Sequence, residues 1–157
     1  MKKVLKKRTG FTLVELLIVI IIIGILAGAM LLVAGSGTDT AEATKIVSNL
    51  RSLKAATLLY YADKAGSSTV PVPEFTETSN DLAQYMDRKL ENGGEYVVEE
   101  GTGDNTSSWY VGYTKLKGKT GVQKKLQESA ASSGLLAGTN DDDVAYSNGD
   151  SVYMKAR

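Results

Sequence analysis

Residues 8–34 read RTGFTLVELLIVIIIIGILAGAMLLVA, and this stretch decides how the rest of the chain is organised. From Leu16 to Ala34 no residue carries a polar side chain. As an α-helix this run would span about 28 Å at ~1.5 Å per residue, close to the ~30 Å hydrocarbon core of a bilayer. The stretch therefore predicts a helix that crosses a membrane.

The charges on either side of the apolar run predict its orientation. Its acidic flank begins with Asp39 and Glu42, and no Lys or Arg lies between Thr9 and Thr44. Because cytoplasmic flanks are enriched in Lys and Arg, the N-terminus is expected in the cytoplasm and the bulk of the chain outside. The basic residues of the N-terminal flank are Lys2, Lys3, Lys6, Lys7 and Arg8.

Composition excludes several classes of function. The chain has 18 basic and 18 acidic residues. Without its first ten residues it has 13 basic and 18 acidic residues. This mildly acidic body argues against nucleic-acid binding through bulk charge. The absence of Cys and His excludes disulfides, thiolate nucleophiles, Cys/His zinc sites and Ser-His-Asp triads. No other motif combines a nucleophile, a base and an oxyanion site, so we expect neither an enzyme nor a cofactor.

Hydropathy alone leaves two simpler interpretations of the apolar run. Ala27-Gly28-Ala29 resembles a signal-peptidase site, although it falls in the middle of the run rather than after it. A plain membrane anchor would satisfy every feature except Glu15, which stands at the start of the run. An ionised carboxylate in such a position is costly and usually marks a function, with a partner of opposite charge. Since the helix itself offers no cation, that partner is expected from outside it.

The segment KKRTG-FTLVELLIVIIIIGILAG resembles the N-terminus of type IV pilins and pseudopilins. The resemblance covers residues 8–29 most closely and combines a basic leader, a Gly-Phe junction, a Glu four residues after the Phe, and an apolar run. It implies that a prepilin peptidase cuts between Gly10 and Phe11 and that the new amine of Phe11 is methylated. It also implies that Glu15 is the assembly residue.

The pairing that the resemblance implies is physically reasonable. The Glu15 carboxylate of one subunit and the Phe11 ammonium of a neighbour would attract strongly in a core of low dielectric, although desolvation offsets much of the gain. We expect the pair to set the axial offset between subunits, because a wrong offset buries an unpaired charge. The expected partners are further copies of the chain in a helical filament, the prepilin peptidase and methylase, the pilus assembly machinery and, before assembly, the membrane.

One departure from the family concerns the bend of the long helix. Many members carry a Pro about 21 residues after the mature Phe, where this chain has Leu32, and no Pro occurs before Pro71. Flexibility is then expected at glycines, each of which costs about 1 kcal/mol of helix propensity. The segment 35–37 is the expected site of a break or an extended stretch. The glycines concerned are Gly24, Gly28, Gly35 and Gly37; the first two also form a GxxxG, typical either of close helix packing or simply of membrane helices.

After Gly37 the pattern becomes that of an amphipathic helix ending near Ala65-Gly66. Apolar residues recur with a period near 3.6, and polar residues are expected on the other faces. The apolar set is Ile46, Val47, Leu50, Leu53, Thr57 or Leu58, and Tyr61, and the polar set is Lys45, Asn49, Arg51, Ser52 and Lys54. The apolar stripe predicts that a globular head covers this half of the helix.

The rest of the chain predicts an α+β head with an antiparallel sheet against the long helix. After a loop at 66–80, a short helix is expected from Ser79 or Asn80 to Leu90, and then paired strands at 95–100 and 108–116. A second short helix is expected at 119–132, and residues 144–146 and 151–154 are expected to form a hairpin around an Asn-Gly turn. The predicted organisation is a leader at 1–10, a membrane and filament-core helix at 11–37, its amphipathic continuation at 38–65, and a head at 66–157.

A calcium site is the remaining candidate. Asp141, Asp142 and Asp143 offer the oxygen ligands that calcium prefers, but they lack the alternating spacing of an EF-hand loop. A solvated acidic turn is the simpler interpretation.

The sequence predicts the structural subunit of a type IV pilus, serving adhesion, twitching motility or DNA uptake. Two alternatives stay open, a pseudopilin of a type II secretion or competence system and a minor tip pilin that acts as a binding module. The presence of Glu15 argues against the tip subunit. The precursor is expected in the cytoplasmic membrane and the assembled subunit in a pilus on the cell surface.

Overall fold

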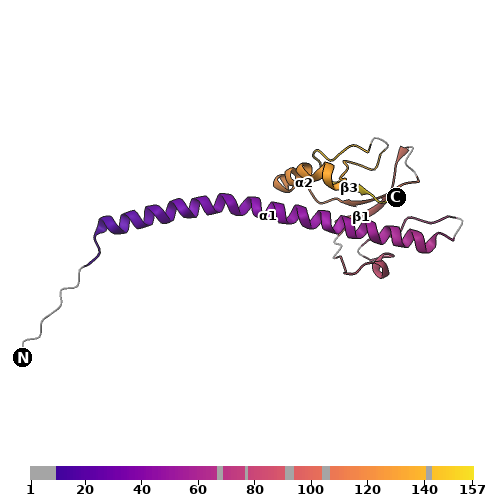
Figure 1. Ribbon diagram of the computed structural model, residues 1–157, viewed down its shortest axis with the longest axis horizontal. Coiled ribbons are helices and arrows are strands. Elements are labelled where there is room, and N and C mark those ends of the chain that lie inside the picture. The colour runs from indigo at the N-terminus through magenta and orange to yellow at the C-terminus, as the bar shows by residue number, and fades with distance from the viewer. Residues whose placement is uncertain (1–9, 67–68, 77, 91–93, 104–106, 141–142) are drawn as a thin grey trace, which may run out of the picture. The chain divides into compact units, whose positions relative to one another are not determined.

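The computed structural model describes residues 10–157 except 67–68, 77, 91–93, 104–106 and 141–142, and it leaves aside the side chains of residues 32–35. The elements follow the order α1, η1, β1, β2, α2 and β3 (Figure 1). Contacts divide the chain into two compact units, Met1–Gly37 and Thr38–Arg157. The long N-terminal helix and three-stranded antiparallel sheet form the helix-plus-sheet layout of the pilin fold.

Helix α1 spans Leu13–Lys64, close to the predicted limits. Its first half is long and apolar enough to cross a membrane, and the chain itself buries none of that segment. Within the described residues, Ser36 and Gly37 are helical and the helical assignment also runs through Gly35. The expected break at 35–37 is therefore absent from this conformation of the chain.

The second half of α1 contributes one face to the core of the head. The fully buried positions on it follow the helical repeat: Ile46, Leu50, Leu53, Thr57 and Tyr60. Of the two alternatives for the apolar stripe, Thr57 is buried and Leu58 is 41% exposed. One detail of the prediction was wrong: Asn49, expected on another face, is only 3% exposed and bonds to Tyr96 and Arg88.

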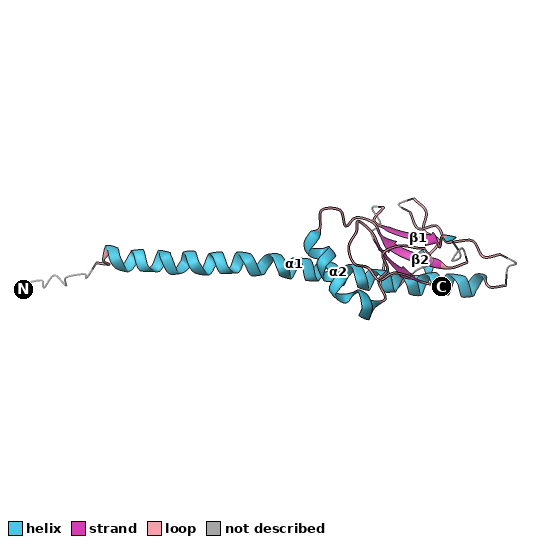
Figure 2. Cartoon of the chain, turned by 90° about the horizontal axis from the view of Figure 1, so that it is seen from above, coloured by secondary structure: helices cyan, strands magenta, loops and turns pink. Residues whose placement is uncertain are grey.

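The sheet is antiparallel, with order β1-β2-β3 (Figure 2). Strands β1, Tyr96–Glu100, and β2, Trp109–Tyr113, form the predicted hairpin. The central strand β2 is buried at every residue, and its Trp109 packs against Tyr60 and Tyr61 of α1. The sheet and α1 therefore share one hydrophobic core.

Helix α2, Thr120–Ser133, also matches its prediction and buries Val122, Leu126 and Ala130. It ends at Gly134, whose left-handed backbone (φ 65°) lets its N–H reach the carbonyl of Ala130. Figure 1 shows α2 and the sheet on one side of the second half of α1 and η1 on the other.

The predicted C-terminal hairpin is wrong. Strand β3, Val152–Lys155, pairs with β2 instead of with residues 144–146. The backbone of Leu136 lies between the two segments and forms bridges to both Ala145 and Tyr153. Tyr146 is buried, and its hydroxyl donates to the carbonyl of Gly149, which closes the loop without strand pairing across it.

The helix predicted from Ser79 or Asn80 to Leu90 is also wrong, since η1, Ala83–Tyr85, is a single 3-10 turn. Asn80 does accept a bond from the N–H of Leu82, but Met86 is already extended. Leu82 and Leu90 are both buried in the core. Burial of these two anchors, rather than helix propensity, decides the path of this segment.

Candidate assembly site at the N-terminus of the long helix

The predicted cleavage junction precedes the first turn of α1. Gly10 and Phe11 are exposed and lie outside regular secondary structure, and α1 begins at Leu13. The Phe11 side chain is 85% exposed. The bond between Gly10 and Phe11 can therefore be reached without unwinding α1.

Thr12 and Glu15 form a capping box at the start of α1. The hydroxyl oxygen of Thr12 accepts the N–H of Glu15 at 3.2 Å. In return, Oε2 of Glu15 accepts both the N–H of Thr12 at 2.8 Å and its hydroxyl proton at 2.7 Å. The two residues thereby satisfy backbone donors that the first turn of a helix leaves without partners, and they place a carboxylate at the positive end of the helix dipole.

This geometry refines what sequence reasoning proposed for Glu15. The carboxylate was expected to need a partner from outside the helix, yet its own chain supplies two neutral donors. Within the described part of the chain no cation pairs with it, and its second oxygen, Oε1, accepts no hydrogen bond there. The signal for the cap was present as Thr-x-x-Glu before an apolar run, a pattern that the sequence reasoning did not use.

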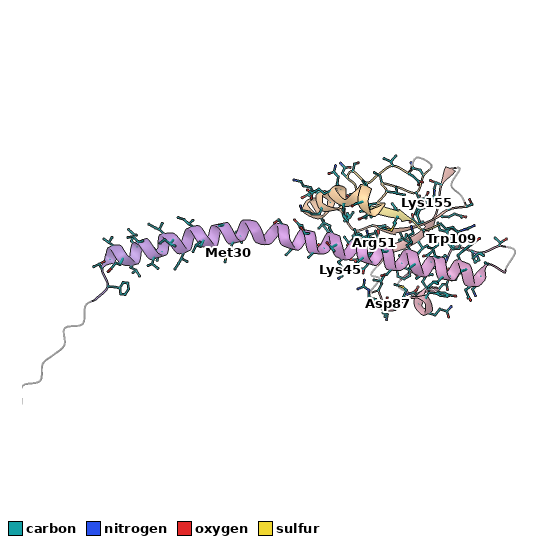
Figure 3. All side chains as sticks on the ribbon, in the orientation of Figure 1. Met30, Lys45, Arg51, Asp87, Trp109 and Lys155 are labelled. Carbon is teal, nitrogen blue, oxygen red and sulfur yellow. The ribbon has the colours of Figure 1, made fainter. Side chains whose placement is uncertain are left out.

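The first half of α1 presents a broad apolar surface. From Leu13 to Met30, large apolar side chains are exposed by roughly half or more, as the side chains along this part of Figure 3 illustrate. At Gly24 and Gly28 an added Cβ would have no atom of the chain within 4 Å, and the same holds for Gly37. The GxxxG pair therefore leaves backbone open to a partner helix.

The calcium candidate falls mostly outside the described residues, which omit Asp141 and Asp142. The carboxylate of Asp143 accepts the hydroxyl of Tyr110 at 3.0 Å and pairs with Lys155 at 3.1 Å. The hydrogen bond from Lys155 lowers the pKa of Asp143. Among the described residues, no group of three metal-ligating side chains comes together.

Comparison with known proteins centres on the same N-terminal segment. The family described as the prokaryotic N-terminal methylation motif matches residues 5–31, which include the Gly10-Phe11 junction, the capping box and most of the apolar run. No curated protein and no solved structure matches the chain. With this motif on a helix-plus-sheet fold, the chain carries the N-terminal signature of the type IV pilin and pseudopilin family.

Proposed function

We propose that this chain is the precursor of a type IV pilus subunit, cut between Gly10 and Phe11 and polymerised through its N-terminal helix. The observation that carries the proposal is the order of features along one segment. An exposed junction, a capping box that holds a carboxylate, and an uncovered apolar helix follow one another within residues 10–31.

Before assembly the subunit is held in the cytoplasmic membrane. The exposed apolar side chains from Leu13 to Met30 need a non-aqueous environment, and lipid supplies it for a single helix. The basic residues 2–8 stay on the cytoplasmic side, where the peptidase acts, and the acidic flank that begins at Asp39 lies outside.

During assembly, helices of neighbouring copies replace lipid around the apolar segment. Cleavage creates an amine on Phe11, next to Thr12. The Oε1 oxygen of Glu15, which accepts no hydrogen bond from the described residues, pairs with this amine of a neighbouring subunit. The Thr12 bonds to Oε2 hold the carboxylate at the helix end, and among the described residues Oε1 has no partner that would compete with an incoming cation. This division explains how one residue both caps its own helix and binds the next subunit.

Mass spectrometry of the mature N-terminus tests the processing step. The expected chain begins at Phe11 and carries a methyl group on its α-amine. A mature chain that begins at Met1, or beyond Ala29, would overturn the proposal.

Variants of Glu15 test the assembly step by electron microscopy of filaments shed from cells. Glu15→Gln keeps an acceptor for Thr12 but removes the charge, whereas Glu15→Val removes both. We expect few or no filaments from either variant, and normal filaments from the control Glu74→Gln on the exposed surface of the head. Filament yields from Glu15→Gln equal to those of the parent chain would exclude the charge contact. Absence of long surface filaments from the parent chain, despite high expression, would favour a pseudopilin.

A further inference from the structure

A cavity of about 490 Å³ lies where the second half of α1 meets the loop after η1 and the start of β1. Lys45 and Asn49 line it from α1, Arg88 and Lys89 from the loop, and Glu95 and Tyr96 from the strand side. Lys45 is labelled in Figure 3 on the side of α1 that faces the loop carrying Asp87. The cavity is separate from the assembly site, and nothing in the N-terminal motif accounts for it.

Three cations of this cavity are not in any ion pair found among the described residues. The ion pairs among the described residues involve Lys119, Lys125 and Lys155, so Lys45, Arg88 and Lys89 take part in none of them. Among the described lining residues, Glu95 is the one acidic residue. These residues together carry a net charge of +2, on a body that is acidic overall.

Arg88 is oriented by hydrogen bonds to the core of the head. Its Nη2 donates to Oδ1 of Asn49 at 2.6 Å, and Nδ2 of Asn49 donates to the hydroxyl of Tyr96 at 2.7 Å. Asn49 and Tyr96 are 3% and 4% exposed, so a buried network orients an exposed guanidinium. A guanidinium has five donors, and the bond to Asn49 uses one of them.

We propose that this cavity binds a phosphoryl group carried on a small polyol. An oriented guanidinium in a cavity that two lysines also line suits a dianionic tetrahedral group, to which an Arg can donate two parallel bonds. The net charge of the lining balances that of a phosphate dianion. A ridge of lysines would suit a polyanion better, whereas a concave site with one oriented Arg suits a single group.

A second cavity suggests the carrier of the phosphate. Arg88, Lys89 and Leu90 also line a neighbouring cavity of about 410 Å³, whose other described walls are Thr76, Thr78, Asn80, Ala83 and Met86. The Thr76 hydroxyl is already bonded to the backbone of Ser79, and Oδ1 of Asn80 accepts the N–H of Leu82. The Thr78 hydroxyl and the amide N–H groups of Asn80 are therefore the groups that suit the hydroxyls of a small polyol. The volume of each cavity exceeds what one inorganic phosphate would fill, so the carrier of the phosphate contributes contacts of its own.

Titration of the full chain in a maltoside detergent and a phosphate-free buffer tests the proposal. The probes are inorganic phosphate and glycerol 3-phosphate, followed by calorimetry and by the amide NMR signals of an isotope-labelled chain. We expect saturable binding of both probes, tighter for glycerol 3-phosphate, with shifts at Leu90, Glu95 and Tyr96. Tighter binding of inorganic phosphate would instead assign the site to the free ion and overturn the polyol part.

Variants distinguish specific binding in the cavity from non-specific attraction of anions to lysines. Lys45→Gln and Lys89→Gln remove cations that make no hydrogen bond in the described structure, and each is expected to weaken binding several-fold. Arg88→Gln is expected to weaken it by about tenfold or more, as loss of bonds to a charged group implies. The control Lys124→Gln removes an exposed lysine of α2 and should leave binding unchanged.

Two outcomes would overturn the proposal. One is a linear drift without saturation for both probes, as ionic screening alone produces. The other is equal weakening in Lys45→Gln and in the Lys124→Gln control. Since binding is measured on the unassembled chain, neither outcome depends on whether the chain forms pili.

Discussion

Glu42 of α1 and Lys119 at the start of α2 form an ion pair with 2.6 Å between Oε1 and Nζ. Lys119 also donates to the hydroxyl of Tyr113 at 3.2 Å, so three elements of the head meet at one ammonium. The hydrogen bond from Glu42, followed by that from Tyr113, raises the pKa of Lys119. Both charged side chains are more than a third exposed, so water screens much of their attraction.

The first prediction concerns this pair. Lys119→Gln is expected to lower the free energy of unfolding of the head by about 0.5–1 kcal/mol, as for a partly exposed pair. Because the folded pKa is raised, the contribution is present at neutral pH and is lost as the pH rises above the ordinary lysine value. Denaturant unfolding of the parent, Lys119→Gln, Glu42→Gln and the double variant measures it. A coupling energy of zero in this cycle would contradict the prediction.

The second prediction concerns buried tyrosines at alkaline pH. Burial raises the pKa of Tyr96 and of Tyr146, and Asp150 adds to the effect at Tyr146. A raised pKa in the folded state means that the neutral form stabilises the fold and that this contribution is lost as the pH rises through the folded pKa. We expect tyrosinate absorbance to rise in two stages, the second together with unfolding. Titration of all eight tyrosines in one step in the folded chain would exclude this.

The third prediction compares two leucines of α1. Leu50 is fully buried in the head, whereas Leu59 is 54% exposed. Leu50→Ala should destabilise the head by about 2–5 kcal/mol through lost burial and a cavity. Leu59→Ala removes the same atoms at the surface and should change the free energy of unfolding by less than about 0.5 kcal/mol. Denaturant unfolding followed by Trp109 fluorescence measures both, and equal losses would mean that α1 does not pack as described.

The fourth prediction concerns a close approach in the central strand. A Cβ added at Gly112 would lie 2.6 Å from ring atoms of Tyr153 and 3.1 Å from a methyl group of Val97. Gly112→Ala should therefore destabilise the sheet by about 1–3 kcal/mol, as overpacking does. Gly66→Ala is the matched control, because a Cβ there meets no atom within 4 Å. Thermal unfolding of the two variants gives the comparison, and a neutral Gly112→Ala would show that the Tyr153 ring moves freely.

The limits of sequence reasoning are clearest in the head. Periodicity identified α1, the β1–β2 hairpin and α2, because each has a local pattern that its own burial imposes. The prediction of a C-terminal hairpin was wrong because the backbone of Leu136, distant in sequence from Tyr153, pairs with Tyr153. From the Asn-Gly turn, that position was expected to be taken by residues 144–146. The short helix failed because burial of Leu82 and Leu90 outweighed local spacing.

The candidate sites divide in the same way. The Gly10-Phe11 junction and Glu15 could be found by sequence, since they form a contiguous motif, and Thr12 could have been found from its spacing to Glu15. The basic cavity could not, because Lys45, Arg88 and Glu95 come from three separate segments. Asn49, which orients Arg88, reads as a surface residue of an amphipathic helix until the loop above it is placed.

The sequence by itself determined that one helix follows a Gly-Phe junction, is apolar enough to enter a membrane, and carries a single carboxylate at its start. These properties depend on residues close together in the sequence, so they can be predicted without knowing the tertiary structure. Only the tertiary structure decided that Thr12 satisfies Glu15 through one oxygen, that Leu136 separates the last two segments, and that Lys45, Arg88 and Lys89 line one cavity. Those outcomes depend on which distant groups compete for the same backbone donors and the same buried space.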